Sequence, residues 1–294
     1  MFSESEITVI ILSGFIGSLI VLLTTFFASK YGSISGVITT IPKNTLVSLL
    51  GISINIDDIE LLQKDIYISI ILCYCAFIYL LIFWIYLPEK IAEQRFPIIK
   101  TCFFGIGIYS LISYLSYQYL ILYLNDILSN KDFLILSILV IFKYYYFSSI
   151  HKFIYKFKDE NIQEKDIDKK EILVRFISSF SVISLIVFIG KINQVLGVIM
   201  SSFPLLSIMN SIILWNDTNN PILISQLNSN ILIGGTAIYM YILSFAFFLG
   251  IVELYLNVII SLSITISIYN YPIYFFLKKI NNKDTKKNIR ITMV

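Results

Sequence analysis

The sequence predicts an all-α polytopic membrane protein of about nine transmembrane helices, in which two inverted-topology four-helix repeats are joined by an extra span. Three observations lead to this fold class: an apolar composition, a one-sided distribution of basic residues and a repeated segment. Of the 294 residues, 57% are hydrophobic and 14% are charged, and the mean hydropathy is +0.82. A soluble domain of this size cannot bury so much apolar surface, and disordered chains do not carry it. The partner that we expect is therefore the lipid bilayer.

The composition also excludes two other classes of protein. Three cysteines in 294 residues are too few for a secreted disulfide scaffold. A net charge of +3 is too small to indicate binding to nucleic acid, so we expect no nucleic-acid partner.

Nine segments are apolar over about the 20 residues that a helix needs to cross a bilayer. The fifth is short and contains Lys143, so eight spans with an interfacial fifth segment are the alternative. The boundary between the last two spans depends on Gly250 and Glu253. The predicted spans are 7–29, 33–55, 66–87, 98–124, 133–150, 172–190, 193–215, 228–250 and 252–277.

Lysine and arginine test the number of spans independently, because they accumulate in cytoplasmic loops. With nine spans, 17 basic residues fall on one side of the membrane and only Lys64, Lys131 and Lys191 fall on the other. With eight spans, the two most basic segments, 151–175 and 278–294, would face opposite sides. We therefore expect a multi-pass protein with its N-terminus outside and its C-terminus in the cytoplasm.

The N-terminal segment is predicted to be a transmembrane span rather than a cleaved signal peptide. It begins with the acidic residues Glu4 and Glu6 instead of a basic leader, and about 20 apolar residues follow. Ser3 and Glu6 have the spacing of a capping box, which would start the helix at the water interface. Two incidental polar residues are the alternative interpretation.

One short segment occurs twice in the chain. Its copies are KYGSISGVITTIP, residues 30–42, and KINQVLGVIMSSFP, residues 191–204. Each has a lysine, a glycine six residues later, Val-Ile, two hydroxyl residues and a proline. A shift of about 161 residues superposes the first four spans on the last four. Because five spans separate the starts of the two copies, they enter the membrane in opposite directions, as in the inverted repeats of many secondary transporters.

This repeat predicts four parts of the chain. Residues 1–130 form the first membrane repeat of four spans, and residues 131–171 form a connector span and a charged cytoplasmic loop. Residues 172–278 form the second, inverted membrane repeat of four spans, and residues 279–294 form a basic cytoplasmic tail.

Pro42 and Pro204 lie well inside predicted spans and are equivalent in the repeat. Proline removes a backbone donor and kinks or unwinds a helix, and in hydrocarbon the freed carbonyls need partners. At about 1.5 Å per residue, Pro42 lies roughly 13 Å into its span, close to the midplane, and Pro204 lies at a similar depth from the opposite face. Two interrupted helices that meet there predict a central solute site. Two ordinary proline kinks, with hydroxyl groups bonded to their own helices, are the alternative.

Lys43 adds a positive charge at this depth, and only Glu253, at the edge of a span, offers an acidic partner. A charge near the midplane costs at least ~2.5 kcal/mol, so we expect Lys43 to face a cavity, a partner or a solute anion. Snorkelling along the helix is the alternative. The second copy has Leu205 instead, so the predicted site is asymmetric. The candidate substrate-binding residues are Thr39, Thr40, Pro42, Lys43, Asn44, Ser201, Ser202, Pro204 and Asn210, and Gly36 and Gly197 are hinge or close-packing positions. Thr45, Ser207 and Ser211 continue the polar face beyond the prolines, where they line a path or hydrogen-bond between helices.

Patterns typical of catalysis and metal binding are missing from the sequence. The only histidine, His151, stands in a basic loop, and Cys73, Cys75 and Cys102 form no Cys-x-x-Cys motif. The spans contain no Walker A loop, no Gly-x-Ser-x-Gly motif and no paired acids. We therefore expect no enzymatic activity, no cofactor and no bound metal.

Several residues of the first repeated segment match a known pattern: Tyr31, Ile34, Ser35, Gly36, Ile41 and Pro42. This segment resembles the one that leads into the second helix of small four-span bacterial membrane proteins of the GlpM type, whose function is not established. Residues 191–204 resemble it more weakly. The resemblance implies a fused duplication of such a unit with one added span, and it implies no catalytic residue and no substrate. Lys43 and the inserted residue before Pro204 depart from the pattern.

These features together predict a secondary transporter or permease that moves a small polar or anionic solute through the midplane site. A structural or assembly protein that does not transport, in which the prolines only shape helices, is the rival interpretation. A lipid-handling protein that binds headgroups at the basic loop is a third.

Overall fold

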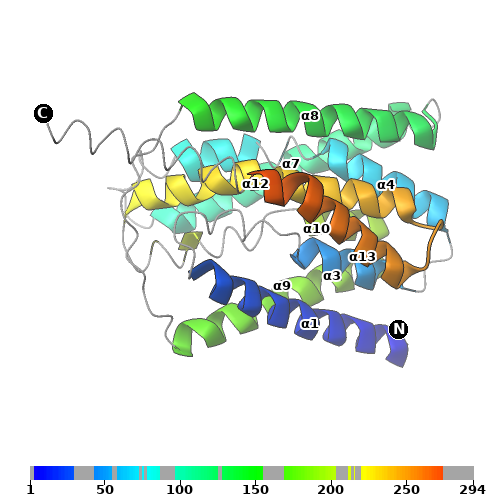
Figure 1. Ribbon diagram of the computed structural model, residues 1–294, viewed down its shortest axis with the longest axis horizontal. Helices are drawn as coiled ribbons and strands as arrows, with labels where there is room; N and C mark the ends of the chain where they lie inside the picture. The colour runs from blue at the N-terminus through cyan, green and yellow to red at the C-terminus, as the bar shows by residue number, and fades with distance from the viewer. Residues whose placement is uncertain are drawn as a thin grey trace, which may run out of the picture.

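The computed structural model describes residues 3–29, 43–54, 58–72, 75, 78–86, 97–124, 128–154, 169–202, 211–212, 215 and 220–273. The regular elements in these ranges are helices (Figure 1). They are α1 (Glu4–Ser29), α3 (Lys43–Ser53), α4 (Ile59–Ile71), the π-helix η2 (Leu80–Tyr86), α7 (Pro97–Leu124), α8 (Asn130–Ile154), α9 (Lys169–Ile192), α10 (Gln194–Ser202), α12 (Pro221–Phe248), α13 (Leu254–Thr265) and the π-helix η3 (Ile266–Asn270).

Five helical stretches of the described chain are long and apolar enough to cross a bilayer, which makes this an all-helical, multi-pass membrane protein. One of them, Asn130–Ile150, contains the fifth predicted span, so this segment is long enough to cross a bilayer. The exact number of nine spans stays a prediction. The five stretches are Glu4–Leu23, Asn130–Ile150, Ile172–Ile192, Ile231–Phe248 and Leu254–Ile273.

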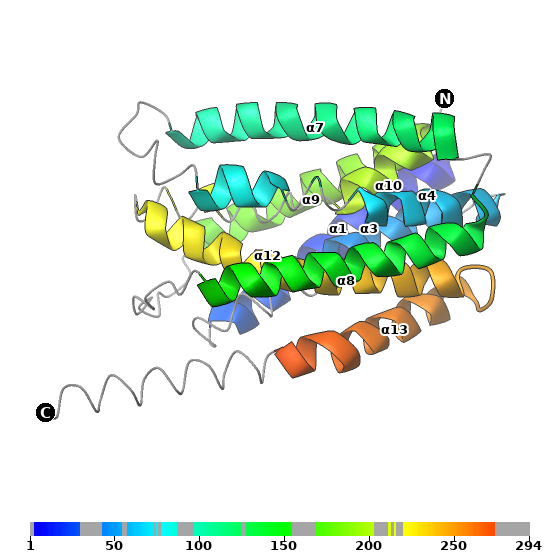
Figure 2. The same ribbon diagram turned by 90° about the horizontal axis from the view of Figure 1, so that it is seen from above.

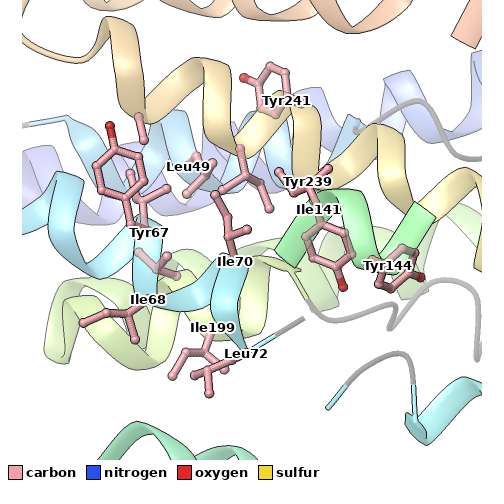
Figure 3. Packing of buried hydrophobic residues seen from close by; sticks show 14 of the residues in the cluster. Leu49, Tyr67, Ile68, Ile70, Leu72, Ile141, Tyr144, Ile199, Tyr239 and Tyr241 are labelled. Carbon is pink, nitrogen blue, oxygen red and sulfur yellow. The ribbon is translucent and has the colours of Figure 1, made fainter. Parts of the chain in front are cut away.

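Helix α12 lies at the centre of the bundle, where α4, α8, α13 and the two π-helices pack against it. Figure 1 shows α8 along one side of the molecule and α1 with α9 along the opposite side, and Figure 2 shows α7 and α13 on the two remaining sides. The outer helices expose large apolar side chains, as expected of surfaces that face lipid. The buried hydrophobic cluster joins α3, α4, α8, α10 and α12 (Figure 3).

Helices α1 and α9 run antiparallel along most of their lengths. Ser184 of α9 donates from Oγ to the carbonyl oxygen of Ile10 at 3.5 Å, and further along the pair the rings of Phe15 and Phe176 meet edge to face at 5.9 Å. A Cβ atom at Gly14 would lie 2.0 Å from Ser184 Oγ, and one at Gly17 would lie 2.4 Å from a side-chain carbon of α9. Small residues thus let the two backbones approach closely, as is typical of helix pairs in membranes.

Two buried serines in this helix pair form the same local bond. Ser18 donates from Oγ to the carbonyl oxygen of Gly14 at 2.6 Å, and Ser179 donates to the carbonyl oxygen of Arg175 at 2.6 Å. In both cases the acceptor lies four residues earlier in the same helix, so the hydroxyl is satisfied without a partner on the other helix.

Polar side chains cap several helix starts. The capping box predicted at the N-terminus is confirmed: the backbone N–H of Ser3 donates to Glu6 Oε2 at 2.8 Å, and the N–H of Glu6 donates to Ser3 Oγ at 3.3 Å. Ser129 and Asp132 form the same reciprocal pair at the start of α8. Asp58 caps α4 by accepting from the N–H of Leu61 at 2.9 Å.

We expect Asp58→Ala to lower the free energy of unfolding by about 1 kcal/mol, because the exposed start of α4 loses the acceptor for a free backbone N–H. Chemical denaturation of the protein in detergent micelles measures this change. Asp58→Asn is the matched control, since the amide oxygen can still accept the bond and stability should stay close to that of the wild type. Equal losses in both variants would contradict a capping role.

The boundary predicted between the last two spans is confirmed. Helix α12 ends at Phe248 and α13 begins at Leu254, with Gly250 in the turn at φ 79°. Such a backbone angle strains residues that carry a Cβ atom. The two helices form a hairpin in which Asn257 of α13 donates from Nδ2 to the carbonyl oxygen of Phe245 at 2.9 Å.

Candidate functional site

Six of the predicted site residues, Thr39, Thr40, Pro42, Pro204, Asn210 and Gly36, lie outside the described residues. Lys43 and Asn44 are the first two residues of α3, and Ser202 is the last residue of α10. The structure therefore describes the predicted site through the start of α3, which follows Pro42 in sequence, and the end of α10, which precedes Pro204.

Helices α3 and α10 are antiparallel neighbours. Near one end of the pair, Thr45 donates from Oγ1 to the carbonyl oxygen of Ser201 at 2.9 Å, and both residues are buried. Near the other end, Ile52 lies against Gly197. Thr45 follows Pro42 by three residues and Ser201 precedes Pro204 by three, so this bond joins the regions of the two prolines.

Ser201 takes part in this contact through its backbone. Its own hydroxyl group donates to the carbonyl oxygen of Val198 at 2.7 Å in the same helix. Ser201, a predicted site residue, thus lies at the contact between α3 and α10, but its hydroxyl group is hydrogen-bonded within α10. The hydroxyl group that crosses between the helices comes from Thr45, which was predicted to continue the polar face beyond Pro42 but not to bind the solute.

Gly197 marks the closest approach of backbones near the site. A Cβ atom at Gly197 would lie 2.3 Å from the Cα atom of Gly190 and 3.1 Å from Ile52 Cδ1. Helix α10 can therefore fold back on the end of α9 only if this position has no side chain. Asn193, between the two helices, accepts a bond at Oδ1 from the N–H of Leu196 at 3.1 Å and starts α10.

Lys191, the lysine of the second repeated segment, ties the far end of α3 to α9. Its Nζ donates to the carbonyl oxygen of Ile52 at 3.4 Å and also to that of Ile54. The last carbonyls of a helix lack partners within it, and a positive charge at that end is favourable. This lysine therefore holds α3 in place rather than serving only as a marker of one membrane side.

A second group of buried polar residues lies in the first half of α12. Asn228 donates from Nδ2 to Ser211 Oγ at 2.8 Å and to the carbonyl oxygen of Ile224 at 2.9 Å. Ser225 donates to the carbonyl oxygen of Ile85 at 2.7 Å. Ser211 was predicted to continue the polar face beyond Pro204, and this contact connects that face to α12.

The sequence reasoning overlooked Asp65. The third span was expected to begin at residue 66, whereas α4 begins at Ile59 and buries Asp65 with 5% of its surface exposed. Glu253 was expected to be the one acidic partner that the predicted spans offer to Lys43; Asp65 lies one residue outside the predicted third span, and α4 buries it. The missed signal is the helical spacing of Leu62, Asp65 and Ser69, which places the carboxylate on the buried face of α4.

The carboxylate of Asp65 lies where α4 meets α10. Gln194, in the first turn of α10, donates from Nε2 to Asp65 Oδ2 at 3.0 Å. Gln63, two residues before Asp65 on α4, donates to the carbonyl oxygens of Ala246 and Leu249 at 2.9 and 2.8 Å. Polar side chains of α4 thus connect it both to α10 and to the end of α12.

No group of three or more His, Cys, Asp or Glu side chains that could hold a metal ion occurs in the described part of the chain. No protein-family model, curated protein or solved structure matches the chain.

Proposed function

We propose that the protein is a secondary transporter or permease that moves a small polar or anionic solute through a site between the segments around Pro42 and Pro204. The observation that carries this proposal is the buried hydrogen bond of 2.9 Å from Thr45 Oγ1 to the carbonyl oxygen of Ser201. Two helices that run in opposite directions are in contact there, each three residues from its proline. Helix interruptions that face each other in this way expose backbone polar groups to a solute at one level of the membrane.

Contacts between repeat-related residues support an inverted repeat of two four-span halves. Phe15 and Phe176 are 161 residues apart, the predicted shift, and their rings touch. Residues that contact their own equivalents lie near a two-fold axis between antiparallel halves. Ser18 and Ser179, also 161 apart, form the same bond to the carbonyl four residues earlier.

The helix starts of the third span in each half support the same arrangement. Asp58 caps α4 and Asn220 caps α12, and these positions are 162 residues apart, as are Pro42 and Pro204. The added residue before Pro204 accounts for the change from 161 to 162. Helix α8, the connector of the proposed repeat, packs against both α4 and α12, as a helix near the axis between the halves does.

Lys43 determines the charge of the solute in this proposal. It begins α3, and Thr45 in the same turn belongs to the contact with α10. A lysine without a matching residue in the second half favours an anionic group on the solute. The proposed orientation has the N-terminus outside and the basic segments in the cytoplasm.

Flux measurements in proteoliposomes test the proposal with inorganic phosphate, sulfate, acetate and glutamate as probes. We expect the wild-type protein to transport at least one of them, Lys43→Ala and Pro204→Ala to abolish this flux, and Thr45→Val to lower it about tenfold through loss of one hydrogen bond. Lys143→Ala is the matched control, because it removes a lysine that is exposed on α8, and its flux should equal that of the wild type.

Two results would contradict the proposal. One is wild-type flux in Lys43→Ala and Pro204→Ala variants that remain folded, which would remove the site. The other is no flux above that of empty vesicles for any of the four probes, which would favour the structural or assembly protein. Binding of headgroups without flux would favour the lipid-handling protein.

A further inference from the structure

We propose that Asp65 is a proton-binding site inside the helix bundle. It is a buried carboxyl group at the contact between α4 and α10, and the transport proposal does not use it. Three features of Asp65 point to proton binding: its burial, its amide partner Gln194 and the charges around it.

Burial separates Asp65 from the other acidic residues of its helix. Its side chain is 5% exposed, whereas Asp58 and Glu60, at the start of α4, are exposed. Its neighbours on the same helix face, three and four residues away, are Leu62, Ile68 and Ser69, all buried. A carboxylate that is removed from water into such surroundings must be paired with a cation, hydrogen-bonded on both oxygens or neutralised by a proton.

The described partner of Asp65 is neutral. Gln194 donates one hydrogen bond to Oδ2, and an amide carries no positive charge that could balance the carboxylate. The adjacent Lys64 acts on Asp65 through its charge. Its Nζ also lies over the ring of Phe133 on α8, 5.4 Å from the ring centroid, so this cation is shared with α8.

In the described part of the chain, the other ionisable groups that act on Asp65 do not carry a positive charge. Asp58 on its own helix and Tyr117 on α7 interact with it electrostatically, and neither is a cation. Helix α10 has no ionisable residue. On the other helices packed against α4, the ionisable residues nearest this level are Lys131 and Asp132, at the start of α8, and Tyr241 of α12.

A proton fits this site better than a metal cation. A metal ion that binds oxygen needs several oxygen ligands at once, and Asp65 belongs to no group of three acidic, histidine or cysteine residues in the described chain. A proton needs only the carboxyl group itself, and Gln194 can hydrogen-bond to either the charged or the neutral form. The site therefore requires no ligand other than the carboxyl group of Asp65 and its neighbour Gln194.

In a transporter, this carboxyl group couples proton binding to the movement of the helices, a role that rests on the proposed function. Protonation weakens the bond from Gln194, because hydrogen bonds to charged groups are the stronger ones. Since α10 also carries Ser201, the proton site and the proposed solute site share one short helix. A proton at Asp65 thereby changes how firmly α10 is held next to the solute.

Labelling with dicyclohexylcarbodiimide tests the proton site without a known solute, because this apolar reagent reacts with protonated carboxyl groups. The full-length protein in detergent is labelled at pH values from about 5 to 9, digested and analysed by mass spectrometry. We expect Asp65 to be labelled at low pH and labelling to decrease as the pH rises. The exposed Asp58 and Glu60 are internal controls and should be labelled far less.

Two variants separate proton binding from a merely structural role. Asp65→Asn removes the label and keeps the size and polarity of the side chain. Gln194→Leu removes a bond that favours the charged form, so the labelling profile of Asp65 should move to higher pH by about one unit or more. Both variants are checked for folding by size-exclusion chromatography.

Three results would overturn the proposal: an unlabelled Asp65 at every pH in the wild-type protein, labelling that does not change with pH, or protection by sodium at constant pH, which would assign the site to a metal cation. The flux experiments use other residues, so a protein without flux that still shows the labelling profile would contradict the transport proposal and leave the proton site in place.

Discussion

Gly197→Ala should destabilise the protein by about 3 kcal/mol, the upper part of the range for overpacking. The added methyl group would lie 2.3 Å from the Cα atom of Gly190 and 2.8 Å from its backbone nitrogen. A side chain could turn away from such a contact, but a helix backbone cannot, so α10 must move away from α9. Because α10 also contacts α3 and α4, this shift disturbs the packing of three helices. Thermal unfolding in detergent micelles measures the loss.

Gly107→Ala is the matched control for this experiment. Gly107 lies in α7, and a Cβ atom there meets no other atom within 4 Å. Alanine is the better helix former by up to about 1 kcal/mol, so this variant should be as stable as the wild type or more stable. If the two variants unfold at the same temperature, the close approach of Gly190 and Gly197 does not exist in the folded protein.

Tyr144→Ala should cost about 3 kcal/mol, because a fully buried aromatic side chain leaves a cavity. Tyr144 is 1% exposed, and its ring lies edge to face on Tyr239 with 5.2 Å between the centroids. Its hydroxyl oxygen would lie 2.5 Å from a Cβ atom at Gly235, so α8 fits against the glycine of α12. In a bilayer the lost contacts are mainly van der Waals packing, since lipid is as apolar as the protein interior.

Tyr146→Ala provides the comparison on the same helix. Tyr146 is 63% exposed on α8, and removal of its ring leaves no cavity in the bundle. We expect a change below about 0.5 kcal/mol, as for other exposed positions. Equal destabilisation by both substitutions, measured by denaturation in micelles, would mean that α8 does not present this face to α12.

Local features of the fold could be predicted from the sequence because they depend on neighbouring residues. The capping box of Ser3 and Glu6 needs two residues three apart, and the turn between α12 and α13 needs one glycine in an unusual conformation. The membrane class followed from composition alone. Each of these inferences uses information contained within about one helix turn or averaged over the whole chain.

Contacts between distant helices could not be predicted in this way. In a membrane helix both the buried face and the lipid face are apolar, so hydrophobic periodicity does not indicate which face is buried. The pairing of Phe15 with Phe176 and of Thr45 with Ser201 depends on this choice. Asp65 was missed for a related reason, since counting apolar residues places a charged residue at the end of a span even when the helix buries it.

The serines between α1 and α9 have a consequence for movement. Ser18 and Ser179 donate their hydrogen bonds within their own helices, so displacement of one helix along the other breaks neither of these bonds. Sliding would break the bond from Ser184 to the carbonyl oxygen of Ile10. It would also meet steric resistance, because side chains of α9 pack into the space at Gly14 and Gly17. Movement of one helix along the other requires the side chains of α9 to leave the space at one glycine and pack elsewhere on α1. Such packing favours a few discrete relative positions of the two helices over a continuous range.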